Sequence, residues 1–171
     1  MNRNTRRFFL LLLVLALSLS ITAVAAANGH APRNFRAHLN GDGEVPPVDS
    51  GGQGQAIFQL SNDGSELSYS LIVANIENVT QAHIHCGPPD DNGPVVVFLF
   101  GRVPDPGVSH NGVLSEGTAT DAHVITRGDS EICPGGVSSL ADVVRQIDAG
   151  NAYVNVHTVD NPGGEIRGQM H

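Results

Sequence analysis

The stretch QAIFQLSNDGSELSYSLIVANI, residues 55–76, decides the fold class. Its first six residues alternate between apolar and polar side chains, and the SNDG that follows is typical of a tight turn. Beyond the turn, residues two apart share one face of a strand, and the apolar or aromatic residues fall on one such face: Leu67, Tyr69, Leu71 and Val73. Two alternating runs around a turn predict a β-hairpin, and therefore an antiparallel sheet.

Outward from this hairpin, Gly- and Pro-rich turns separate further short segments that favour strands. One of them, VVVFLF at 95–100, is a continuous apolar run and predicts a strand buried on both faces. The loop that follows it is predicted over 101–112. The other predicted strands cover residues 34–39, 80–86, one or two segments of 113–125, 151–160 and 165–170.

One segment, residues 138–150, has a helical pattern instead. Its apolar residues repeat at a spacing of three and four, a serine precedes them and Gly150 follows them: Leu140, Val143, Val144 and Ile147. Seven or eight strands with one inserted helix predict an all-β fold, an antiparallel β-sandwich or barrel.

The first 27 residues have the pattern of a secretory signal: three arginines, an apolar run from Phe8 to Leu19, and small residues at 23–27. An uncleaved anchor helix is the alternative, although the run is short for a span of about 20 residues. We predict a signal peptide at 1–27, a flexible N-terminus at 28–34 and one domain at 35–171. The protein is then exported, to a periplasm, the medium or the cell surface, with no membrane span after cleavage.

The charge of the mature chain is strongly negative. All nine basic residues are arginine and three lie in the signal, which leaves six against 17 acidic residues and a net charge of −11. Such a chain should repel nucleic acid and anionic membranes. Solubility explains the acidity, and calcium binding at Asp90, Asp91 and Asn92 is the weaker alternative because no twelve-residue calcium loop surrounds them.

The two cysteines, Cys86 and Cys133, form an even pair in a chain predicted to be exported. Such pairs oxidise outside the cytoplasm, so we predict a disulfide. Two free thiols acting as metal ligands are the alternative.

Three histidines suggest a metal site. His83 and His85 lie two residues apart on a predicted strand, so both point to one face. His157 lies on the polar face of another strand, AYVNVHT. Neutral imidazole suits copper and zinc, and the three rings converge if the strands are neighbours. Exposed histidines on a polar sheet face are the alternative.

A second candidate site lies at the N-terminus. If cleavage follows residue 27, the mature chain begins Asn28, Gly29, His30. A free amine, two backbone amides and an imidazole form a square-planar nitrogen set for Cu(II) or Ni(II). A chance histidine near a chain end is the alternative.

Four motifs together resemble the CHRD domain, first described as a repeat in chordin and found in many exported bacterial proteins. The likeness runs from about residue 35 to 170 and implies an exported β-domain, in a family whose biochemical role is poorly defined. The motifs occur in the family's order: AHLNGDGEVPPV at 37–48, AHIHCGPPDDNGPVVV at 82–97, AYVNVHT at 152–158 and NPGGEIRGQ at 161–169.

The chain is also similar, more distantly, to copper/zinc superoxide dismutases, which have a His-x-His strand, a later Val-His strand and a disulfide. This resemblance implies a Greek-key sandwich and places His83, His85 and His157 at three copper positions. The dismutase zinc loop is missing, because residues 87–109 hold no histidine. The resemblance therefore implies a three-histidine copper site without the zinc set.

Three hypotheses follow for function. The first is a copper-binding module, with Tyr153 or Asn155 beside the metal. The second is a non-enzymatic domain that binds a protein or cell-surface partner through its loops. The third is a copper redox enzyme of the superoxide dismutase type. The sequence favours a non-enzyme, because it holds no nucleophile elbow, phosphate-binding loop or paired carboxylates.

Overall fold

The computed structural model describes residues 33–171 of the chain. The predicted signal at 1–27 and the N-terminal site of Asn28, Gly29 and His30 lie outside the described residues. Of the predicted flexible segment 28–34, the two described residues, Arg33 and Asn34, belong to the first strand.

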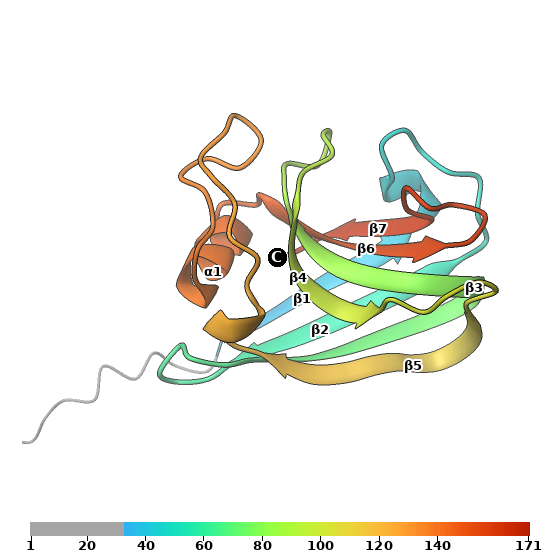
Figure 1. Ribbon diagram of the computed structural model, residues 1–171, viewed down its shortest axis with the longest axis horizontal. Coiled ribbons are helices and arrows are strands. Elements are labelled where there is room, and N and C mark those ends of the chain that lie inside the picture. The colour runs from blue at the N-terminus through green and yellow to red at the C-terminus, as the bar shows by residue number, and fades with distance from the viewer. Residues whose placement is uncertain (1–32) are drawn as a thin grey trace, which may run out of the picture.

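The described residues form seven strands, one α-helix and two short 3-10 turns (Figure 1). They are β1 Arg33–Asn40, η1 Gly41–Gly43, β2 Gln53–Leu60, β3 Leu67–Cys86, β4 Val95–Gly101, β5 Val108–Ala119, η2 Asp121–His123, α1 Leu140–Asp148, β6 Ala152–Thr158 and β7 Ile166–Gln169.

Five antiparallel strands close into a barrel. The order β2-β1-β7-β6-β3 forms a ring because β2 also pairs with β3, and β4 and β5 add to β3 outside the ring. The predicted fold class, an all-β antiparallel barrel or sandwich with one short helix, is confirmed.

The predicted hairpin is confirmed as β2 and β3, whose antiparallel register runs from Gln53↔Ala74 to Leu60↔Leu67. Every second residue of β2 is buried, as the alternation predicts. Phe58 of β2 and Leu71 of β3 are both fully buried. Burying side chains of this size stabilises the fold by roughly 1.5–3 kcal/mol each, so the hairpin is the centre of the core.

The strand after the turn is longer than predicted. We expected separate strands at 66–76 and 80–86, but β3 continues through 20 residues. Asn75 and Asn78 adopt positive φ, and the register shifts around them, so the strand bends without ending. Asparagine tolerates this conformation. The first half of β3 pairs with β2 and β5, and the second half with β6 and β4.

Two further expectations are corrected. β5 begins at Val108, inside the segment predicted to be a loop, because it continues the pairing with the bent strand β3. β4 is not buried on both faces, since Phe98 is 37% exposed. β4 ends the strand order and is covered less completely than a central strand.

The helix and the disulfide close one end of the barrel. Ser139 caps α1 by accepting a hydrogen bond from the Asp142 amide, and Gly150 follows the helix with φ of 69°. Cys86, the last residue of β3, is bonded to Cys133 in the segment before the helix. The predicted disulfide is thus confirmed, and the thiols cannot act as metal ligands. Within residues 33–171 no helix has both the length and the apolar character that crossing a bilayer requires.

Candidate metal centre

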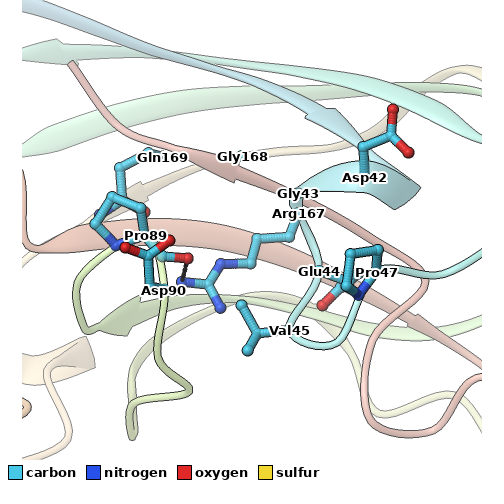
Figure 2. A pocket seen from close by; sticks show the side chains of 10 residues that line it. All are labelled: Asp42, Gly43, Glu44, Val45, Pro47, Pro89, Asp90, Arg167, Gly168 and Gln169. Atoms are coloured by element: carbon cyan, nitrogen blue, oxygen red, sulfur yellow. Dashed lines mark hydrogen bonds between the residues drawn. The ribbon is translucent and has the colours of Figure 1, made fainter.

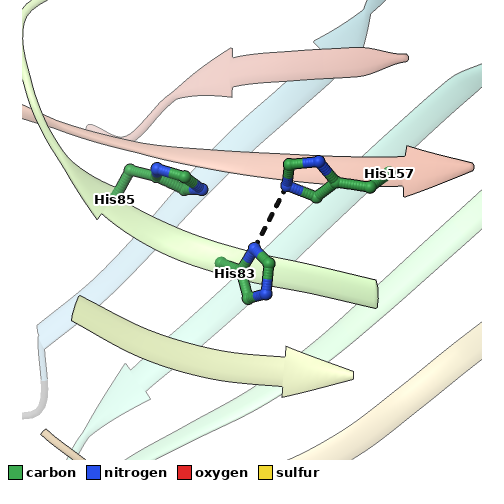
Figure 3. Close-up of side chains that lie close together, drawn as sticks. All are labelled: His83, His85 and His157. Carbon is green, nitrogen blue, oxygen red and sulfur yellow. Dashed lines mark hydrogen bonds between the residues drawn. The ribbon is translucent and has the colours of Figure 1, made fainter. Parts of the chain in front are cut away.

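Pairing of β3 with β6 brings the three predicted histidines together. In the register, His83 lies opposite Asn155, His85 opposite Tyr153, and His157, two residues beyond Asn155, opposite Gln81. Because residues two apart share a face, all three imidazoles point to the same side of the sheet. Figure 3 shows the rings converging from the two strands.

The cluster is buried. His83, His85 and His157 are 2%, 7% and 6% exposed. Loops cover the polar side of β6, so all seven of its residues are buried. The alternative of exposed surface histidines is therefore wrong. One nitrogen from each ring lies within 4.8 Å of the other two, a grouping that can hold a metal ion.

Backbone carbonyls fix the orientation of two rings. Nδ1 of His85 donates to the Gly93 carbonyl at 2.8 Å, and Nδ1 of His157 donates to the Pro162 carbonyl at 3.0 Å. A neutral imidazole carries one proton, so each ring keeps a lone pair on Nε2. Metal-binding histidines are usually held by such a bond from the nitrogen that does not bind the metal.

The third ring completes the set. Nδ1 of His83 lies 3.1 Å from Nε2 of His157, close enough for a hydrogen bond in the absence of metal (Figure 3). Nε2 of His83 and Nε2 of His85 are buried without a hydrogen-bond partner among the described residues. Buried polar atoms are seldom left unpaired, and the unpaired Nε2 of His85 is a donor atom that a metal ion in the cluster could use.

The protonation state suits metal binding. Burial lowers the pKa of His83 to about 3, with further lowering from the neighbouring histidines and Arg102. Burial also lowers the pKa of His85 to about 4, although the bond to Gly93 opposes the shift. The pKa of His157 is lowered by burial as well. The three rings are neutral at neutral pH, which is the form that binds metals.

Aromatic side chains surround the cluster. Tyr153 stacks on His85 with ring centroids 4.7 Å apart, and its hydroxyl accepts from the Gly93 amide. Phe98 of β4 meets His83 edge to face at 4.3 Å. The sequence predicted Tyr153 or Asn155 beside the candidate metal site, but Phe98 was missed because it stands in an apolar run typical of a core strand.

A second buried polar group lies on the same sheet and was also missed. Arg167 is 2% exposed, stacks on the Tyr153 ring at 3.4 Å, and donates to backbone carbonyls of the loop 87–94. Asn155 donates to the Glu44 carboxylate at 3.1 Å. Figure 2 shows Arg167 reaching between the loops that carry Pro89 and Glu44, beside a pocket of about 440 Å³.

The remaining described histidines stay apart from the cluster. His38 lies on β1, His110 on β5 and His123 in η2, and His171 is the last residue. The convergence of the three predicted histidines therefore depends on strand pairing, not on the abundance of histidine in the sequence.

Comparison with known proteins gives one match. The family model of the CHRD domain matches residues 35–170. No curated protein and no solved structure matches the chain. The likeness to superoxide dismutases therefore stays a prediction from the sequence.

Proposed function

The chain belongs to the CHRD-domain family, and from that premise we propose that it is an exported protein that binds copper through His83, His85 and His157. The observation that carries the proposal is the arrangement of three buried imidazoles, two of them fixed by carbonyls so that each keeps the lone pair on Nε2. Chance placement of surface histidines would not produce this arrangement.

The spacing of the donor atoms fits a metal ion after a small movement. Bonds of about 2.0 Å from a metal to imidazole place the nitrogens about 3.3–3.5 Å apart. His83 and His157 are already at 3.1 Å, while the set as a whole spans up to 4.8 Å. The widest pair of nitrogens needs to close by about 1.3–1.5 Å, which a side-chain rotation accommodates.

Copper and an extracellular location are the finer parts of the proposal. Imidazole accepts both copper and zinc, and the motif likeness favours copper. The disulfide between Cys86 and Cys133 supports an oxidising compartment. The role that fits a buried site with neutral ligands is to hold or deliver the ion, without a requirement for catalysis.

The test is metal titration of the purified protein followed by thermal unfolding. We expect one equivalent of copper to bind and to raise the unfolding free energy by about 2.7 kcal/mol at 100 times the dissociation constant. His83→Ala should abolish this binding, whereas His38→Ala, which alters an exposed histidine, should leave it intact. A His30→Ala variant separates binding at the predicted N-terminal site. Binding that survives His83→Ala but not His30→Ala would contradict the proposal.

A further inference from the structure

We infer that the three-histidine site is built to hold copper as the monovalent ion, Cu(I), in preference to Cu(II) and Zn(II). The inference rests on the proposed function and extends it from the element to the charge state. Imidazole alone does not decide between these ions, so the choice depends on coordination number and on local charge.

The number of donors favours Cu(I). Within residues 33–171 the cluster brings together three imidazoles and no carboxylate or thiolate. The one sulfur next to it in sequence, Cys86, is consumed by the disulfide and points to the opposite face of β3. Cu(II) prefers a tetragonal set of at least four ligands, whereas Cu(I) has a filled d shell and is stable with three.

The surroundings leave little access for water to complete a divalent coordination sphere. Nε2 of His85 is inaccessible to solvent, and His83 is only 2% exposed. Phe98 packs its ring against His83 from β4, and Tyr153 covers His85. A tetragonal ion would need this aromatic cover to open, while a three-coordinate ion would not.

The local charge points the same way. Two arginines lie beside His85: Arg127 donates to the carbonyl of Val95, which is opposite His85 in the register, and Arg167 lies over the Tyr153 ring that stacks on His85. Both arginines repel positive charge on His85, and Arg102 does so on His83, in addition to the larger effect of burial. A divalent ion placed among neutral ligands meets twice the repulsion from these groups that a monovalent ion meets. The Glu44 carboxylate is bonded to Asn155 and is not part of the donor cluster.

Anaerobic competition assays test the inference. The protein in a His30→Ala background, which removes the predicted N-terminal Cu(II) site, competes with bathocuproine disulfonate for Cu(I) and with a chromogenic chelator for Zn(II) or Cu(II). We expect one equivalent of Cu(I), lost in His83→Ala, to bind more tightly than Zn(II). Histidine-dependent binding of a divalent ion as tight as that of Cu(I) would overturn the inference and leave the metal site standing. No binding of any metal would overturn the proposed function as well.

A charge variant tests the electrostatic part separately. Arg102 is exposed, so Arg102→Gln should fold normally and lower the repulsion. At low ionic strength we expect the Zn(II) affinity to rise about fivefold and the Cu(I) affinity to rise less. Arg36→Gln, on the exposed face of β1, is the matched control and should change neither. A ratio of the two affinities that does not move in Arg102→Gln would refute the contribution of local charge.

Discussion

The buried carboxyl of Glu44 is the group whose charge we expect to oppose folding. Glu44 is 5% exposed, its Oε2 accepts one bond from Asn155, and its Oε1 has no partner among the described residues. Burial raises the pKa of Glu44 to about 7, against smaller lowering effects of Arg167 and of the Asn155 bond. We predict that Glu44→Gln stabilises the protein at alkaline pH.

The magnitude follows from proton linkage. The folded state holds the Glu44 proton up to about pH 7, whereas the unfolded chain releases it near the ordinary value of 4.5. This group therefore favours folding most below pH 4.5, and the advantage is lost as the pH rises to 7. The difference between the folded and unfolded pKa values of Glu44 corresponds to about 3 kcal/mol of unfolding free energy. Water that enters between the covering loops should reduce this cost of ionising Glu44 to about 2 kcal/mol.

Urea denaturation at several pH values measures this effect. The difference in unfolding free energy between Glu44→Gln and the wild type should be near zero at pH 4.5 and reach about 2 kcal/mol in favour of the variant at pH 8. Taking the difference at each pH cancels the other titrating groups. A variant that is less stable than the wild type at pH 8, or equally stable at every pH, would show that Arg167 compensates the carboxylate.

Three more predictions follow from the described contacts. Removing the disulfide with Cys86→Ala and Cys133→Ala should lower the unfolding free energy by about 4 kcal/mol, measured by urea denaturation, because the bond closes a long loop. The metal-free protein should lose stability as pH falls from 6.5 towards about 4, which thermal melts in the presence of a chelator test. The pKa of His83 is lowered to about 3 in the folded state, so in this range His83 takes up a proton in the unfolded chain but not in the folded protein. Gly164→Ala should lower the unfolding free energy by at least about 2 kcal/mol. Gly164 has a φ of 133°, and a methyl group there would lie 2.6 Å from the side-chain oxygen of Asn155 and 2.7 Å from Oε1 of Glu44. Gly163→Ala is the control, because a methyl group at Gly163 meets open space and should cost under about 1 kcal/mol in the same melts.

The features that the sequence predicted correctly are those defined by residues close together in the chain. The alternation around 55–76 gave the hairpin, and the capped apolar repeat at 138–150 gave the helix. The two-residue spacing of His83 and His85 gave their shared face. Each of these depends only on the geometry of neighbouring residues, which the sequence displays directly.

Other features depend on pairing between distant residues. The neighbourhood of β3 and β6 joins residues about 75 positions apart, as the contact between His83 and His157 shows, and no spacing in the sequence encodes it. The burial of the polar face depends on irregular loops that have no periodicity. Asn75 and Asn78 look like turn residues, which is why one bent strand was predicted as two. The buried polar group of Glu44, Asn155 and Arg167 was missed because its members come from three separate segments.

The closure of the barrel by β7 has a consequence for biosynthesis. The ring stays open until residues 166–169 pair with β6 and β1, so a nascent chain leaving the ribosome cannot complete its core while those residues are still being made. His157 also arrives long after His83, and the proposed site does not exist in a partial chain. The polypeptide would thus remain threadable through a secretion channel and be incapable of capturing copper through this site during synthesis.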